Sequence, residues 1–286
     1  MPQIIRIRSE NADFQLLEAL GRSREKRRKH GLFVIEGVRS INLALQHGWT
    51  FDALLIPEDA SLSRWGHDVL ERAEAARHFL IAPQGYGLLT DRNDGSEIMA
   101  LLRLPGHDLS RLLTQPGGRV VLLDRPGNPG NLGSIVRSCD AFGVGGVGVV
   151  GHGVDPYSRE AIRASTGSLL AVPVVHFPGP AEVREWLDTV RQKVEGVRVV
   201  GTDEHGEQTA RAYDFAGFTV LVAGNETSGM SAALRELCDV TLRIDIAGSA
   251  SSLNVAVATS ILLYEMSLSA QARSAQAPSA QTGGNP

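Results

Sequence analysis

Hydrophobic residues follow two alternating patterns along the chain. Short runs of consecutive apolar residues, typical of buried strands, occur at residues 32–35, 53–56, 79–81, 98–104, 119–124, 146–150, 172–175, 197–200, 219–222 and 241–244. The three- and four-residue spacing of amphipathic helices occurs at residues 11–20, 38–46, 62–77, 134–142 and 253–268. This alternation predicts an α/β fold, and the uninterrupted apolar runs of the second half predict a parallel sheet that is buried on both faces.

The chain has 286 residues, enough for two domains, and one segment rich in proline and glycine suggests where they divide. We expect a smaller N-terminal α/β domain over residues 1–106, a linker over residues 107–118 and a second domain over residues 119–268. Residues 269–286 contain no large apolar side chain, so we expect them to form a disordered tail.

Positive charge is concentrated at the N-terminus. The formal net charge of the whole chain is −4, but residues 1–30 contain eight Arg or Lys residues and four acidic residues, a local charge of +4. A basic end on an acidic body is typical of a surface that binds a polyanion, although a solvated helix face accounts for it equally well. The candidate residues are Arg22, Arg24, Arg27, Arg28 and Lys29.

Several classes of protein are disfavoured. No apolar run approaches the ~18 residues of a membrane-spanning helix, and residues 1–6 lack the features of a secretory signal, so we expect a cytoplasmic protein with no membrane partner. Cys139 and Cys238 have no partner spacing that indicates a disulfide framework or a zinc site. The acidic residues around His205 are expected in an exposed turn, and no metal site is predicted.

Gly127, Gly130 and Gly133 lie between a buried strand and a predicted helix, where backbone amides can bind an anion. A dinucleotide-binding fold is one interpretation of this segment. However, the spacing is G-x-x-G-x-x-G rather than G-x-G-x-x-G, and the next strand is not followed by the acidic residue that would hold a ribose. A P-loop is disfavoured because no lysine lies near these glycines.

Polar residues follow three of the predicted strands. Asn131 and Arg137 belong to the segment after the first strand of the second domain, Glu226 comes shortly after the strand at 219–222, and Ser252 and Asn254 precede the last helix. Taken singly, such residues are explained as helix caps, surface ion pairs or solvated turns. Together they lie at strand ends, where α/β proteins form their sites, and so predict a functional site.

The segments that carry these residues resemble a known family. Residues 128–137, 223–230 and 251–258 are similar, in order and separation, to the three motifs of the SpoU/TrmH family of RNA ribose 2'-O-methyltransferases, and residues 33–37 resemble its N-terminal substrate-binding domain. The resemblance implies a C-terminal methyltransferase domain with a parallel sheet and a trefoil knot. It also implies a smaller N-terminal α/β domain like ribosomal protein L30e.

The family resemblance assigns roles to individual residues. It implies an obligate homodimer that binds S-adenosylmethionine in the knot, with cofactor contacts from Gly224, Asn225, Ile244 and Leu253. It implies that Arg137 is the catalytic arginine and that its neighbours are Asn131, Glu226, Ser252 and Asn254. One position departs from the family, because Asp245 stands where proline is usual. Loss of proline's fixed φ is expected to loosen the loop there.

The resemblance also suggests the substrate. It favours ribosomal RNA over transfer RNA and leaves an antibiotic-resistance function open, while the basic residues of the N-terminal segment become candidates for holding the RNA backbone. We expect Arg137 to bind a phosphate and stabilise developing negative charge, because a guanidinium with a pKa above about 12 is a poor general base. The alternatives are a non-catalytic RNA-binding protein with the same fold and a dinucleotide-dependent oxidoreductase.

Overall fold

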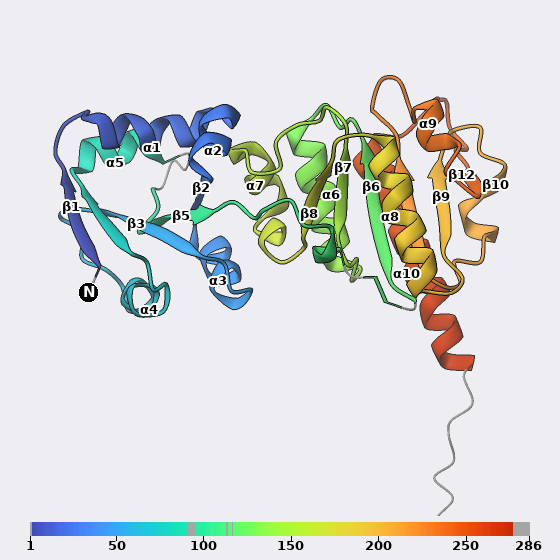
Figure 1. The fold of residues 1–286 in the computed structure, drawn as a ribbon, viewed down its shortest axis with the longest axis horizontal. Helices are drawn as coiled ribbons and strands as arrows, with labels where there is room; N and C mark the ends of the chain where they lie inside the picture. Colours follow the sequence, from blue (N-terminus) through green and yellow to red (C-terminus); the bar gives the residue numbers. More distant parts are fainter. Residues whose placement is uncertain (1, 91–94, 113, 116, 277–286) are drawn as a thin grey trace, which may run out of the picture.

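The computed structural model describes residues 2–90, 95–112, 114–115 and 117–276, which form two α/β units side by side (Figure 1). The N-terminal unit has a five-stranded sheet in the order β1 (Gln3–Ile7), β4 (Arg77–Ile81), β3 (Phe51–Pro57), β5 (Met99–Arg103) and β2 (Leu32–Glu36). Its helices are α1 (Ala12–Arg22), α2 (Arg24–His30), α3 (Val38–Gln46), α4 (Arg64–Arg72) and α5 (Pro83–Leu89). Strand β5 is antiparallel to both of its neighbours, whereas β1, β4 and β3 are parallel.

The C-terminal unit has a seven-stranded sheet in which every strand pair is parallel, as predicted. The strand order is β10 (Gln208–Thr209), β12 (Val240–Arg243), β9 (Arg198–Thr202), β11 (Thr219–Ala223), β6 (Arg119–Asp124), β7 (Val147–Val150) and β8 (Val174–Phe177). The helices are α6 (Pro129–Ala141), α7 (Arg159–Ser165), α8 (Pro180–Lys193), α9 (Ala232–Arg235) and α10 (Val255–Gln276), with 3-10 turns η1 (Leu109–Arg111), η2 (Ser168–Leu170) and η3 (Ala210–Ala212).

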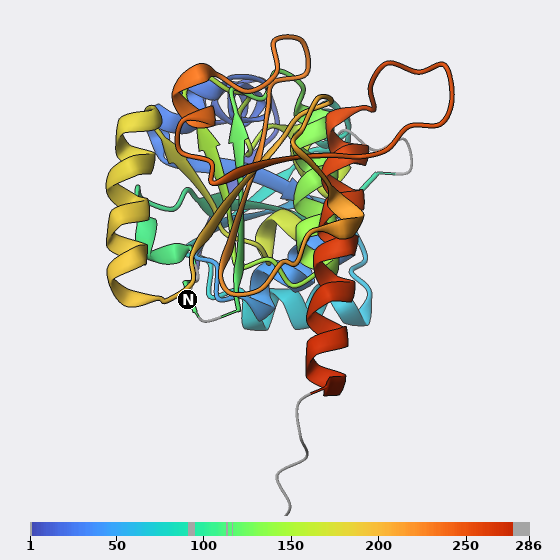
Figure 2. The ribbon, with the colours of Figure 1, turned by 90° about the vertical axis from the view of Figure 1, so that its right-hand side faces the viewer.

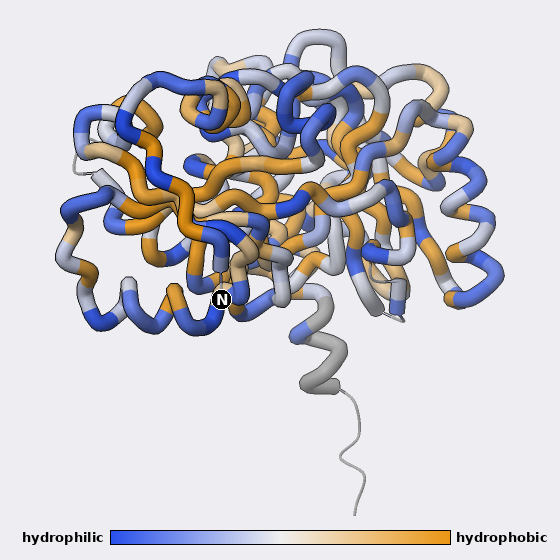
Figure 3. The backbone as a smooth tube through the Cα atoms, turned by 60° about the vertical axis from the view of Figure 1, so that its left-hand side comes forward, coloured by the Kyte–Doolittle hydropathy of each residue, from blue (hydrophilic) through white to orange (hydrophobic). Residues whose placement is uncertain are grey.

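The two faces of the seven-stranded sheet have separate cores. Along β6, Val121 and Leu123 pack with α6, α7 and α10, whereas Val120 and Leu122 pack with α8 and α9. This division follows from the strand period of two, which sends alternate side chains to opposite faces. Apolar segments accordingly concentrate in the inner strands, and polar segments lie on the outer helices and loops (Figure 3).

The core that includes α6, α7 and α10 continues into the N-terminal unit. Phe33 on β2 packs against Tyr157 and Trp49, with ring centroids 4.7 and 5.5 Å away. The indole Nε1 of Trp49 donates a hydrogen bond of 2.8 Å to the carbonyl of Leu170. The two units therefore meet through packed apolar side chains and not only through the connecting segment.

Several elements were not predicted from the sequence, and one helix begins earlier than expected. The elements outside the prediction are strands β1 and β10 and helices α2, α5, α7, α8 and α9. Strand β1 lies at the sheet edge with only Ile7 buried, and α5 contains two glycines. Helix α6 begins at Pro129 instead of residue 134, because Asn128 caps it and proline fits the first helical position. Most of the glycine segment is therefore helical.

The last helix is longer than predicted. It runs to Gln276, so the expectation that disorder begins at residue 269 is wrong for residues 269–276. Alanine, glutamine and arginine have high helix propensity, so they extend an existing helix at little cost in free energy even where no large apolar residue is present. The remainder of the expected tail, residues 277–286, lies outside the described residues. Among the helices that the structure describes, none has the length and apolarity needed to cross a membrane.

Candidate active site

The first part of the site is the junction between β6 and α6. The side chain of Asn128 accepts a hydrogen bond of 3.0 Å from the backbone N–H of Asn131 and so fixes the first turn of the helix. A Cβ atom at Gly133 would lie 2.4 Å from the carbonyl oxygen of Ala161. Glycine at this position therefore permits the close packing of α6 against α7, which sets where the polar face of α6 points.

A chain of hydrogen bonds joins the three motifs. The carboxylate of Glu226 accepts from the backbone N–H of Gly127 at 3.0 Å and from the side-chain amide of Asn131 at 3.1 Å. Asn131 in turn accepts from the amide of Asn254 at 3.1 Å. Asn254 caps α10 by accepting from the backbone N–H of Ala256 at 2.9 Å. Residues nearly a hundred or more positions apart are thus held in one network.

The loop after β11 is held rigidly. Asn225 and Gly229 exchange two backbone hydrogen bonds of 3.0 Å, and the side-chain oxygen of Asn225 accepts from the backbone N–H groups of Thr227 and Ser228. The side-chain amide of Asn225 also donates to the carbonyl of Arg125 at 2.7 Å. The side chain of Asn225, a predicted cofactor residue, is therefore engaged in hydrogen bonds within the protein. These bonds set the shape of the loop.

Asp124 is a structural member of the site that sequence reasoning did not single out. Its side chain lies at the carboxyl end of β6, is 2% exposed, and accepts hydrogen bonds from the Arg125 guanidinium and from the backbone N–H of Ser231. Burial raises the pKa of Asp124, but these hydrogen bonds outweigh it and hold the pKa below its usual value. The sequence signal that could have identified Asp124 is an acidic residue directly after the apolar run of β6.

Glu226 is held as a carboxylate. Burial raises the pKa of Glu226, but the hydrogen bonds from Gly127 and Asn131 lower it more, so its pKa lies below the ordinary value. Since folding lowers this pKa, the stabilisation by the carboxylate is present above pH ~4.3 and is lost as the pH falls through the lowered value.

Replacing Glu226 with glutamine is expected to destabilise the protein by about 1 kcal/mol at pH 7, because the amide can no longer accept from both donors and one hydrogen bond is worth about 1 kcal/mol. Differential scanning calorimetry measures this. The melting temperatures of E226Q and of the wild type should also differ at pH 7 and converge as the pH falls through the lowered pKa of Glu226. A gap between the two melting temperatures that stays constant from pH 7 to pH 3 would contradict the assignment.

A groove with a volume of about 560 Å³ lies where α6, α7 and α10 meet. Asn131, Arg137 and Asn254 all line it, as the sequence predicted for residues of a shared site. Ser138 and Ser260, whose hydroxyl oxygens are 2.7 Å apart, join α6 to α10 beside it. Arg137 is exposed, and its side chain makes no hydrogen bond or ion pair with any residue that the structure describes. Its guanidinium can therefore bind an external anion such as a phosphate.

The predicted cofactor residues lie in loops of the C-terminal unit: Gly224 directly follows β11, Ile244 directly follows β12, and Leu253 lies shortly before α10. Gly224, Ile244 and Leu253 are each partly buried. Within the described part of the chain, the backbone groups of these three loop residues make no hydrogen bond to other protein groups. Backbone donors and acceptors beside partly buried apolar side chains fit a ligand that combines an aromatic base with polar groups, so these residues fit S-adenosylmethionine.

The loop between β12 and α10 contains the two remaining positions, and it stands away from the body of the unit (Figure 2). Ser252 is exposed and is not part of the hydrogen-bond chain that holds Asn254. Asp245, which replaces the family's usual proline, forms an ion pair of 3.4 Å with Arg243 and its side chain is 69% exposed. The added charge therefore faces water and its neighbouring arginine.

The basic N-terminal residues lie on α1 and α2, but they are not equivalent. Arg22, Arg28 and Lys29 are exposed, whereas the exposed Arg24 donates a hydrogen bond of 2.6 Å to the carbonyl of Gly153. The assignment of Arg27 to RNA binding is wrong. Arg27 is 3% exposed, and its guanidinium is occupied by an ion pair of 2.7 Å with Asp155.

Comparison with known proteins identifies the family. Residues 118–264 match the SpoU rRNA Methylase family, and residues 11–100 match the SpoU L30e-like domain. The chain is 43% identical over 265 residues to the 23S rRNA (uridine(2479)-2'-O)-methyltransferase of Streptomyces viridochromogenes, covering 92% of each protein. It is 29% identical to the Bacillus subtilis 23S rRNA (guanosine(2553)-2'-O)-methyltransferase RlmP, covering 85% of this chain and 92% of that protein.

Solved structures give the same result. The SpoU methyltransferase AviRb from Streptomyces viridochromogenes, crystallised with the cofactor AdoMet, superposes with a TM-score of 0.86 at 41% identity, covering 94% of this chain and all of that one. An AdoMet-bound rRNA methyltransferase from Sinorhizobium meliloti superposes with a TM-score of 0.81 at 29% identity, covering 92% and 97% of the two chains. The protein described here belongs to the SpoU rRNA methylase family and carries the family's L30e-like domain at its N-terminus.

Proposed function

We propose that this protein transfers a methyl group from S-adenosylmethionine to a ribose 2'-hydroxyl of 23S ribosomal RNA. The observation that supports it most directly is the hydrogen-bond chain from Gly127 through Glu226 and Asn131 to Asn254, which unites the three motifs beside Arg137. The relative that is 43% identical is named as a 23S rRNA 2'-O-methyltransferase, and the similar AviRb structure contains AdoMet.

The chemistry requires orientation more than activation. When bound, S-adenosylmethionine supplies a methyl group on a positively charged sulfur, which is already reactive toward an oxygen nucleophile. Gly224, Ile244 and Leu253 would hold the cofactor through backbone groups, and Asn225 would keep the loop after β11 in place. Arg137 would bind the phosphate next to the target ribose, position the 2'-oxygen and stabilise the charge that develops on it.

The role of Glu226 is positional. Both of its oxygens accept hydrogen bonds from groups of the protein, and its lowered pKa makes it a weak base. Glu226 therefore serves to orient Asn131. Ser252, on the exposed loop, is kept as a candidate for contact with the substrate.

The direct test is methyl transfer from tritiated S-adenosylmethionine to unmodified 23S rRNA and, separately, to transfer RNA. Label in ribosomal RNA alone supports the proposal, and label in transfer RNA alone would replace it with the tRNA alternative. Cofactor binding without transfer to either RNA would favour a non-catalytic protein. Comparing 2'-O-methyl groups in cells with and without the protein then gives the nucleotide, and growth of both strains in ribosome-directed antibiotics tests a resistance function.

RNA binding is proposed to use the exposed basic residues of the N-terminal unit. Replacing both Arg28 and Lys29 with alanine is expected to weaken binding of 23S rRNA and to reduce the slope of log affinity against log salt by up to about two. Filter binding at several salt concentrations measures both quantities. Replacing Arg72, an exposed arginine of α4 that pairs with Asp68, is the control. An unchanged salt slope in the double variant would remove these residues from the RNA surface.

The active form is proposed to be a homodimer that uses helix α10. Val257, Tyr264 and Leu268 are 48%, 51% and 40% exposed. At 100° per residue they fall on one stripe of the helix. Ile261 lies on the same stripe and lines the groove of Arg137 together with Val257 and Tyr264. A second copy covering this stripe would bury it and enclose the groove.

Replacing Tyr264 with glutamate is expected to give a monomer without methyl transfer activity, because a two-fold interface would contain the charge twice. Sedimentation velocity and the tritium assay measure the two effects. The matched control is Ile4→Glu, which places the same charge on an aliphatic residue that is 59% exposed on the distant strand β1. A Tyr264→Glu variant that still sediments as a dimer would overturn this interface.

Three further assignments complete the proposal. We assign residues 1–106 to an RNA substrate-binding domain, residues 107–118 to the linker and residues 119–268 to the methyltransferase domain. The trefoil knot is expected from family membership, with the cofactor loops forming it. We propose a cytoplasmic location, because the protein would meet a ribosomal RNA substrate there.

A further inference from the structure

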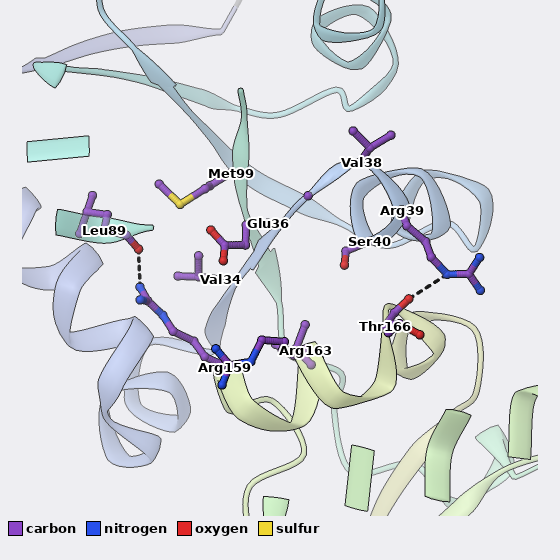
Figure 4. Close-up of a pocket in the computed structure, with 12 residues that line it drawn as sticks. Val34, Glu36, Val38, Arg39, Ser40, Leu89, Met99, Arg159, Arg163 and Thr166 are labelled. Carbon is purple, nitrogen blue, oxygen red and sulfur yellow. Dashed lines mark hydrogen bonds between the residues drawn. The ribbon is translucent and has the colours of Figure 1, made fainter. Parts of the chain in front are cut away.

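A second cavity, of about 330 Å³, lies between the two units and outside the candidate active site (Figure 4). On one side it is bounded by the end of β2, the start of α3, the end of α5 and by β5. On the other side it is bounded by α7. Its volume falls at the small end of the range for ligand pockets, which suits a nucleotide-sized group and not an RNA helix.

The cavity combines an apolar floor with charged walls. Val34, Met99 and Ile162 contribute the floor, while three arginines and one glutamate contribute the charge. Among these, Arg39 donates a hydrogen bond of 2.8 Å from Nε to the carbonyl of Thr166. A guanidinium has five N–H donors, so Arg39 retains donors for a phosphate while this bond keeps it at the cavity wall.

Glu36 gives the cavity a hydrogen-bond acceptor. The hydroxyl of Thr90 donates to its carboxylate at 2.8 Å. Figure 4 shows the Glu36 side chain among the residues that line the cavity. An ionised carboxylate only accepts hydrogen bonds and can accept more than one. It therefore matches the exocyclic amino group of adenine, cytosine or guanine. Uracil instead presents its single N–H between two oxygens that repel a carboxylate.

Helix α7 connects this cavity with the groove of Arg137. Ile162, Arg163 and Thr166 line the cavity, whereas Ala164 lines the groove. At 100° per residue, Ala164 lies roughly opposite the midpoint of Ile162 and Arg163 on α7, which ends at Ser165. The two openings are therefore about one helix diameter apart, roughly 10–12 Å, which corresponds to about three stacked nucleotides.

We propose that this interdomain cavity binds an unstacked nucleotide of the RNA substrate, near the nucleotide whose ribose is methylated. The base lies on the apolar floor and donates to Glu36, and the phosphate is held by Arg39. Single-stranded RNA is commonly recognised through bases that leave the stack and enter such pockets. The identification of the ligand as RNA rests on the proposed function. The inference adds a specificity site to which both units contribute residues.

The test uses the full chain and two pairs of variants. Arg39→Ala removes the phosphate contact, and Arg72→Ala is its control on α4. Val38→Trp narrows the cavity from its rim, where Val38 is 54% exposed, and Ile4→Trp adds the same bulk to a residue that is 59% exposed on β1. Binding of 23S rRNA is measured by filter binding without cofactor, and methyl transfer is measured with saturating cofactor.

Arg39→Ala and Val38→Trp are each expected to raise the Kd and the KM for 23S rRNA about tenfold, with kcat and cofactor affinity near wild type and both controls within twofold. RNA binding and KM at wild-type values in both cavity variants would overturn the inference and leave the proposed methyl transfer intact. Weaker RNA binding in both cavity variants, with no methyl transfer by the wild-type protein, would support the cavity while removing the proposed function.

Base selectivity provides a second measurement. The wild-type protein is expected to bind fluorescein-labelled hexanucleotides of adenosine and cytidine at least fivefold more tightly than the uridine hexanucleotide. Glu36→Gln should reduce this ratio, because an amide also donates to the oxygens of uracil. Equal affinity of the wild type for the three hexanucleotides, or an unchanged ratio in Glu36→Gln, would overturn the assignment of Glu36.

Discussion

Replacing Arg137 with alanine is expected to lower kcat for methyl transfer to 23S rRNA by about 10²–10³-fold. Arg137 lines the groove formed by α6, α7 and α10 and is exposed. Its side chain makes no hydrogen bond or ion pair among the described residues, so the fold does not depend on its charge. The expected loss is that of one charge-stabilising donor aimed at a developing oxyanion. The tritium assay at saturating cofactor and RNA measures it.

Two controls separate this role from a structural one. The melting temperature and cofactor affinity of Arg137→Ala should equal those of the wild type, because Gly224, Ile244 and Leu253 are untouched. Arg137→Lys should recover only part of the lost rate, since lysine keeps the charge but cannot form the bidentate contact of a guanidinium with phosphate. Turnover of the alanine variant within threefold of wild type would exclude Arg137 from the reaction.

The motifs predicted the site because its residues lie at strand ends. In a parallel sheet, the carboxyl ends of β6 and β11 meet at one edge, so Asn131 and Glu226 could be expected near each other before any coordinates were known. The contact of Asn131 with Asn254 could not be derived in this way. It depends on how the last helix packs against α6, and no local periodicity encodes that packing.

The charge pattern predicted the RNA-binding residues less well than the motifs predicted the site. Sequence alone shows that Arg27 and Arg28 are adjacent in a basic segment. It does not show that α2 turns Arg27 toward the C-terminal unit and Arg28 toward solvent. That difference arises from the tertiary contact with Asp155 and from the helical period, which places neighbours 100° apart. Strand β1 was missed for a related reason, because it lies at the sheet edge and only Ile7 of its five residues is buried.

Replacing Arg27 with alanine is expected to destabilise the protein by about 3–5 kcal/mol, because it leaves a carboxylate buried without its partner. The Arg27 guanidinium pairs with Asp155 at 2.7 Å and also donates to the carbonyl of Leu20 at 2.8 Å. The side chains of Arg27 and Asp155 are only 4% and 13% exposed, so solvent screens the pair poorly. The melting temperature should fall by about 10 °C, measured by calorimetry.

The neighbouring residue supplies the matched control. Arg28 lies on the same helix and is exposed, so Arg28→Ala should leave the melting temperature within about 2 °C of wild type while weakening RNA binding. A double variant, Arg27→Ala with Asp155→Ala, should recover part of the lost stability, since it removes the unpaired carboxylate along with the arginine. An Arg27→Ala protein that melts like the wild type but binds 23S rRNA more weakly would show that this guanidinium faces RNA. That result would exclude the buried ion pair between Arg27 and Asp155.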